Sequence, residues 1–159
     1  MTTLGRMLQE ISQLNGLQNK PLLEINFEVA IEKAKKLDDF FEEHGRPRGP
    51  LHGLPVTLKD QFHVIGLNTT MGYASWINTF EGDKDSPLVG QGESQLVADL
   101  VSLGAVVIGK TTCVQSLGYG ETNNNLLGYN FNPVNPKLSS GGSSGGKSSK
   151  SKRAGKPAS

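Results

Sequence analysis

The chain has 159 residues, which is enough for one domain with a core, because a chain of about that length buries about two-thirds of its unfolded surface. A hydrophobic content of 35% with 20 glycines indicates many turns or a flexible segment. The single cysteine excludes an internal disulfide framework and favours a reducing compartment. With no basic-then-apolar leader and no apolar run of membrane-spanning length, we expect a cytoplasmic protein.

The net charge of +1 is unevenly distributed along the chain. Residues 147–159 hold five basic residues and no acidic one, which leaves 11 basic and 15 acidic residues for the rest. A basic segment of this kind could contact nucleic acid or anionic lipid. We favour a disordered, Ser/Lys-rich tail, so a nucleic-acid partner is not favoured.

The first part of the chain predicts two amphipathic helices. Apolar residues at helical spacing from Leu4 to Leu14 indicate the first, within an N-terminal segment of residues 1–21. The second follows Asn26, whose side chain can cap it, and Gly45 ends it. Its predicted apolar stripe consists of Phe27, Ala30, Ile31, Ala34, Leu37, Phe40 and Phe41.

A βαβ unit is predicted next. Leu54–Leu58 is typical of a short buried strand, and loops with one short helix are expected over Val64–Gly92. A helix over Ser94–Leu103 and a strand over Ala105–Gly109 follow. Strand, crossover and strand indicate an α/β fold with a parallel pair. Another helix is predicted over Thr111–Leu117, before a polar loop.

Lys59 and Asp60 stand where the first strand of this unit ends. In layered α/β proteins, sites lie outside the carboxyl ends of strands. The Lys59 side chain either extends to water or lies near a partner that alters its proton affinity. From the residues alone we favour extension to water.

The remaining chemistry-bearing side chains give little support for other sites. Cys113 could be a nucleophile by type, but no histidine follows it, so a buried structural thiol is favoured. His44, His52 and His63 lack metal-ligand spacing. We therefore expect no metal and no cofactor.

Ser139–Gly146 contains only serine and glycine, and it admits three interpretations. A flexible tether is the first. Residues 141–148 also match the phosphate-loop pattern G-x-x-x-x-G-K-S, but prolines precede them and no apolar helix face follows. The third is a hydroxyl relay, in which Ser143 or Ser144 passes protons to Lys59. Sequence spacing cannot show that these side chains meet.

Five blocks, in a fixed order, resemble the amidase signature enzymes, and within them the general amidase or acetamidase-like members found in fungi. The blocks are Arg48–Asp60, Thr69–Tyr73, Leu103–Thr111, Gly120–Asn124 and Ser140–Gly146. The resemblance covers residues 22–146 as a partial amidase domain. It implies an α/β fold with a mixed sheet flanked by helices, of which the chain holds only the N-terminal portion.

The resemblance also implies an activity, the hydrolysis of a small-molecule carboxylic amide to the acid and ammonia by a Ser–cis-Ser–Lys triad. It assigns Lys59 as the catalytic lysine and Ser143 as the bridging serine with the cis peptide bond. Supporting roles fall to Ser144, Gly141 and Gly142. The loop implied to line the substrate pocket consists of Leu117, Gly118, Tyr119, Gly120 and Glu121.

The chain departs from the family pattern after Gly146. The family's nucleophilic serine follows the bridging serine in a second glycine-rich motif, and nothing in Lys147–Ser159 resembles it. We expect the nucleophile to lie beyond the chain end, and the chain to be a truncated or mis-spliced product that is inactive alone. The alternative is a non-catalytic pseudo-enzyme fragment that binds a partner through its basic tail. The oligomeric state stays open.

Overall fold

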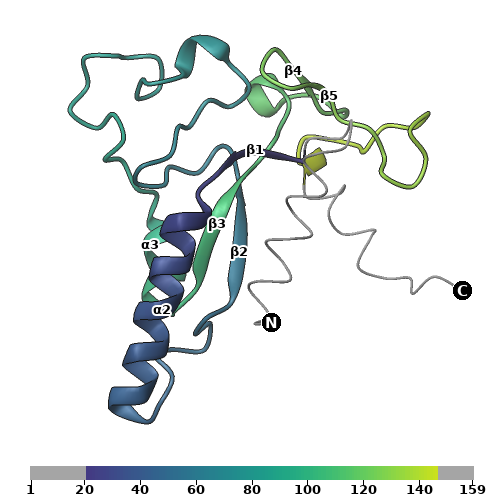
Figure 1. Cartoon of the computed structure of the whole chain (residues 1–159). Helices are drawn as coiled ribbons and strands as arrows, with labels where there is room; N and C mark the ends of the chain where they lie inside the picture. The colour runs from purple at the N-terminus through teal and green to yellow at the C-terminus, as the bar shows by residue number, and fades with distance from the viewer. Residues whose placement is uncertain (1–20, 147–159) are drawn as a thin grey trace, which may run out of the picture.

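The computed structural model describes residues 21–146 of the chain (Figure 1). The helix predicted over Leu4–Leu14 and the basic tail predicted over residues 147–159 lie outside this range. In chain order the elements, with η for a 3₁₀ helix, are β1 (Leu22–Ile25), α2 (Phe27–His44), β2 (Pro55–Lys59), η1 (Ala74–Trp76), α3 (Gln95–Ser102), β3 (Val106–Thr111), η2 (Gln115–Leu117), β4 (Asn123–Asn124) and β5 (Gly128–Tyr129).

A three-stranded mixed sheet forms the centre of the fold, in the order β1-β3-β2. β3 pairs with β2 in parallel and with β1 antiparallel. All six residues of β3 are buried, as expected for a strand with a neighbour on each side. The predicted βαβ unit and the α/β class are therefore confirmed, with each strand displaced toward its carboxyl end by one or two residues. β1 was not predicted.

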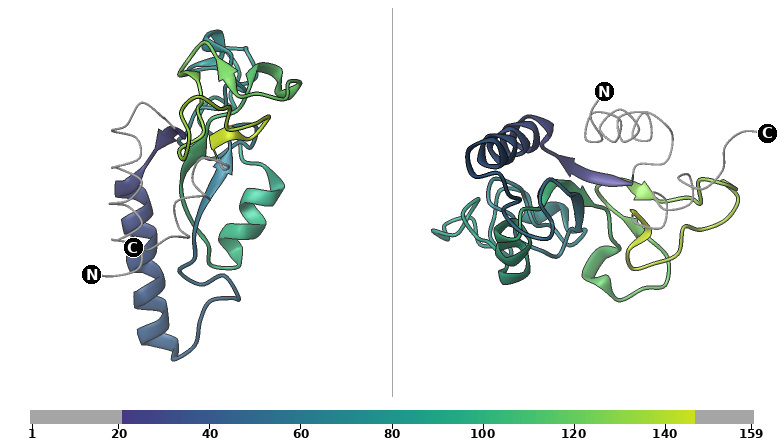
Figure 2. Two further views of the ribbon diagram at one scale, coloured as in Figure 1. Left: turned by 90° about the vertical axis from the view of Figure 1, so that its right-hand side faces the viewer. Right: turned by 90° about the horizontal axis from the view of Figure 1, so that it is seen from below.

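The two α-helices cover opposite faces of this sheet (Figure 2). Successive side chains of a strand point to opposite faces, so neighbouring residues of β3 pack against different helices. Val106 packs with Ala30 and Leu37 of α2. Val107 packs with Val97 of α3 and with Leu58. The core therefore consists of two thin apolar layers that hold β2 and β3 between them.

Local signals set both ends of α2, as predicted. The Asn26 side chain accepts a hydrogen bond from Val29 N at 3.2 Å, and Gly45 ends the helix with φ of 63°. The predicted apolar stripe is too wide, because Ile31 and Phe41 are 39% and 48% exposed. A three-stranded sheet offers a narrow face, and the buried residues of α2 are only Ala30 and Leu37.

The helix predicted over Thr111–Leu117 is wrong. Thr111 ends β3, where it pairs with Lys59, and the only helical turn in this stretch is the 3₁₀ turn η2. Ser116 and Leu117 have positive φ of 54° and 63°, which a right-handed helix does not allow. The polar loop that follows includes a short hairpin, in which Asn123 pairs with Tyr129.

In the part of the chain that the structure describes, no helix has both the length and the apolar character that a membrane span requires.

Candidate functional site

Lys59 is the last residue of β2, and its side chain contacts the glycine-serine segment. Lys59 Nζ donates a hydrogen bond to Ser143 Oγ at 2.6 Å, across 84 positions of sequence. Both residues are half-buried. The interpretation favoured from the residues alone, in which Lys59 extends to water, is therefore wrong, because residues 139–146 pass over the end of the strand.

The glycine-serine segment is a hydrogen-bonded loop and not a free tether. Ser140 Oγ donates to Asn130 O at 2.9 Å. Buried Thr122 donates to Gly141 O and accepts from Gly145 N, both at 2.9 Å. The backbone of residues 141–145 is thus anchored on each side of Ser143. Two residues of the formal phosphate-loop pattern, 147 and 148, lie outside the described range.

The peptide bond between Gly142 and Ser143 is cis. Gly142 also lies close against the loop that was predicted to line a pocket. A Cβ at Gly142 would lie 2.7 Å from Tyr119 O and Gly120 C, and 2.8 Å from Glu121 N. A larger residue therefore does not fit at this position without moving the loop.

The loop residues themselves face outward. Tyr119 is 67% exposed, and Glu121 Oε2 accepts a hydrogen bond from Tyr129 OH at 3.1 Å. Leu117 has a positive φ and begins the turn into the loop. Ser144 is half-buried and has no hydrogen-bond partner among residues 21–146. The structure thus places the predicted loop and Ser144 beside Ser143, but it gives neither a contact with Lys59.

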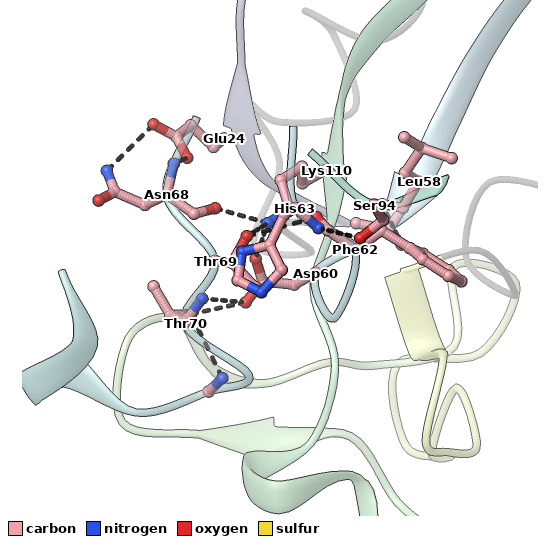
Figure 3. Close-up of polar contacts among 12 residues, drawn as sticks. Glu24, Leu58, Asp60, Phe62, His63, Asn68, Thr69, Thr70, Ser94 and Lys110 are labelled. Atoms are coloured by element: carbon pink, nitrogen blue, oxygen red, sulfur yellow. Dashed lines mark hydrogen bonds and ion pairs between the residues drawn. The ribbon is translucent and has the colours of Figure 1, made fainter. Parts of the chain in front are cut away.

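A buried ion pair between Asp60, the residue after Lys59, and Lys110 was not predicted (Figure 3). Asp60 and Lys110 are both fully buried, and Lys110 Nζ lies 2.9 Å from Asp60 Oδ1. Lys110 Nζ also donates to Asn68 O at 2.6 Å and to Thr69 Oγ1 at 2.7 Å. Asp60 Oδ2 accepts from the Thr70 hydroxyl at 2.6 Å and from Thr70 N at 3.2 Å.

Burial lowers the pKa of Lys110, and the charge and hydrogen bonding of Asp60 oppose this shift. One sequence signal could have revealed the pair. Lys110 directly follows the apolar run Ala105–Gly109, which was predicted to be a strand, and a lysine in a buried strand needs an acidic partner.

The structure does not favour Cys113 as a nucleophile. Its side chain is 1% exposed, and burial, followed by the nearby Asp60 charge, raises the pKa of the thiol to about 12. The predicted buried structural thiol is confirmed.

His44 and His63 stack on phenylalanine rings, and His52 Nδ1 lies 2.9 Å from Arg48 N. Within residues 21–146, no three side chains of the metal-binding types gather at one place.

The Lys59–Ser143 contact is the chemically distinctive feature of this surface. A hydroxyl at 2.6 Å from an amine can exchange a proton with it directly. A serine hydroxyl becomes a proton carrier or a nucleophile only beside such a base.

The sequence of the chain was compared with those of known proteins. The family model described as Amidase matches residues 4–150. "Amidase 2" from Gibberella moniliformis is 48% identical over 130 residues, which is 81% of this chain and 23% of that protein. "Acetamidase" from Emericella nidulans is 44% identical over 119 residues, which is 75% of this chain and 20% of that protein.

Solved structures agree with the sequence matches. A fatty acid amide hydrolase superposes with a TM-score of 0.74 at 30% identity, over 91% of this chain and 24% of that one. The peptide amidase from Stenotrophomonas maltophilia gives a TM-score of 0.73 at 28% identity, over 90% of this chain and 28% of that one. The chain spans only about a quarter or less of the length of the two curated relatives, Amidase 2 and Acetamidase.

Proposed function

The chain belongs to the amidase family, and from this premise we propose that it is the part of a carboxylic amide hydrolase that carries the proton-transfer pair Lys59 and Ser143. The observation that carries the proposal is the 2.6 Å contact between Lys59 Nζ and Ser143 Oγ. The fold of the sheet that presents Lys59 is that of amide-hydrolysing relatives, which supports the reaction class.

In the proposed mechanism, Lys59 is the final proton acceptor. A nucleophilic serine attacks the amide carbonyl carbon, and its proton passes to Ser143 Oγ while the Ser143 proton passes to Lys59 Nζ. The reverse transfer protonates the leaving nitrogen, so ammonia or an amine departs and an acyl-enzyme ester remains. Water, deprotonated through the same pair, then attacks the ester, and the pair returns that proton to the departing serine oxygen as the acid is released.

The nucleophile is not assigned to any residue of the described range. Ser143 is the serine whose hydroxyl contacts Lys59 among residues 21–146. The matched stretch makes up only 23% of one relative and 20% of the other. We therefore propose that a polypeptide of these 159 residues does not hydrolyse amides by itself.

The proposed substrate is a small-molecule amide, and the proposed binding surface is the loop from Leu117 to Glu121 with Gly142. The exposed ring of Tyr119 and the carboxylate of Glu121 offer apolar and polar contacts on the loop against which Gly142 packs. A reduced, free Cys113 is consistent with the cytoplasm, which we propose as the location.

A chimaera tests the proposed roles. The matching stretch of the Emericella nidulans acetamidase is replaced by the corresponding residues of this chain, and ammonia release from acetamide is measured. Lys59→Ala and Ser143→Ala are expected to lower the rate about a thousandfold or more, because each breaks the proton path.

The matched control is Lys36→Ala, which removes a lysine from the exposed face of α2 and leaves the relay intact. It is expected to keep the rate of the parent chimaera. A Lys59→Ala chimaera as active as its parent would refute the proposed role of Lys59.

A further inference from the structure

We propose that the buried Asp60–Lys110 pair, together with Thr70, is a positioning unit that fixes the distance between Lys59 Nζ and Ser143 Oγ. This inference rests on the proposed function, since it concerns the same proton-transfer pair. Asp60 and Lys110 are positioning residues that act through Lys59 and Ser143.

The first argument is that stability alone does not account for the pair. Removing two charges from water costs more than their attraction returns unless the geometry is excellent, and apolar replacements of buried ion pairs are often neutral or stabilising. Here both side chains are completely buried, and their four further hydrogen bonds go to the single segment of residues 68–70. The arrangement therefore fixes one loop to one strand end.

The second argument concerns the backbone under Lys59. Lys59 pairs with Thr111, and Asp60 N donates to Thr111 O at 3.1 Å, so Lys59 and Asp60 leave the end of β2 on opposite faces of the sheet. The register between β2 and β3 shifts by one residue before Gly109, and Lys110 then pairs with Leu58. This irregularity turns Lys110 to the face of Asp60. The ion pair thus holds the residue that immediately follows Lys59.

The third argument concerns the backbone at Ser143. Thr70, held by Asp60, accepts a hydrogen bond from Gly72 N at 3.3 Å. The neighbouring Met71 O accepts from Ser116 N at 3.1 Å, and a Cβ on Gly72 would lie 2.7 Å from the Gln115 Cα. This second loop reaches Ser143, because Val114 N donates to Ser143 O at 3.4 Å.

Both chains of contacts start from the Asp60 carboxylate. One leads to Lys59 and the other to Ser143, the two residues joined by the 2.6 Å contact. Glu24 of β1 reinforces the shared loop, since its carboxylate accepts from Asn68 N at 2.7 Å (Figure 3). A change in the ion pair should therefore move Lys59 and Ser143 relative to each other.

The test is competitive trace labelling of the 159-residue chain with acetic anhydride at fixed pH. Peptide mass spectrometry gives the acetylation rate of Lys59 relative to that of exposed Lys35 in the same molecule. Ser143→Ala calibrates the readout, because it removes the hydrogen bond from Lys59, and it should raise the relative rate about tenfold. Lys110→Met is expected to raise it by a similar factor.

A gentler pair of variants guards against loss of the fold. Thr70→Val keeps the shape but removes the hydroxyl that binds Asp60, and it should raise the Lys59 rate, whereas Thr70→Ser keeps the hydroxyl and should not. Leu37→Ala destabilises a core away from the pair and should leave the relative rate at the wild-type value.

Wild-type rates in Thr70→Val and Lys110→Met, beside a raised rate in Ser143→Ala, would overturn the positioning role. An unchanged rate in Ser143→Ala would overturn the contact on which that role depends. Labelling requires no turnover, so these results are independent of whether the chimaera hydrolyses acetamide.

Discussion

Ellman's reagent can test whether Cys113 is the protonated thiol that the structure indicates. With a pKa of about 12, the fraction present as thiolate at pH 8 is about one in ten thousand. In the unfolded chain, with a cysteine pKa of about 8.5, about a quarter is thiolate at the same pH. The folded protein should therefore react about two-thousandfold more slowly than the protein in guanidinium chloride, before any protection by burial.

The pH dependence identifies the reacting state. Reaction of the native thiol should accelerate about tenfold for each pH unit above 8, whereas reaction through transient unfolding should level off near pH 9 and accelerate with urea. A native rate within tenfold of the denatured rate, rising with pH and insensitive to urea, would refute the assignment and return Cys113 to the candidate nucleophiles.

The remaining predictions concern stability, measured by urea unfolding or thermal denaturation. Gly109→Ala should lower the free energy of unfolding by about 1–3 kcal/mol, because its Cβ would collide with Glu24 O, whereas Gly120→Ala, with nothing within 4 Å, should not. Asn26→Ala should cost about 1 kcal/mol by removing the helix cap, and Lys36→Ala should leave the midpoint unchanged. Folding raises the pKa of Cys113, so the contribution of the protonated thiol to the free energy of unfolding is complete below about pH 8.5 and is lost at up to about 1.4 kcal/mol per pH unit as the pH rises toward 12. The stability of the wild type should therefore fall more steeply with pH than that of Cys113→Ala. Parallel stability curves for the two proteins would contradict this.

Features encoded by near neighbours could be predicted from the sequence. The ends of α2 depend on Asn26 and Gly45, whose effects act within a single helical turn. β2 and β3 are short apolar runs between turn residues, so the presence of both strands and the position of Lys59 at a strand end could also be predicted. These signals need no knowledge of the rest of the fold.

Features that depend on distant partners could not be predicted in the same way. β1 is four residues long with an acidic residue inside it, and it becomes a strand because β3 offers an edge. The contact between Lys59 and Ser143 joins positions 84 apart, so the residue types could be named but their meeting rested on family resemblance. The partner of Lys110 depends on a register shift that residue order does not reveal.

The central position of β3 has a consequence for how the chain is made. Both of its neighbours are synthesised earlier, and the 86 residues that separate Ile25 from Thr111 take about 4–17 s to translate at about 5–20 residues per second. During that interval β1, and β2 once it has been made, lack their partner β3, and unpaired apolar strands are surfaces on which nascent chains associate wrongly. The ribosome-bound chain should therefore be a chaperone client until β3 emerges.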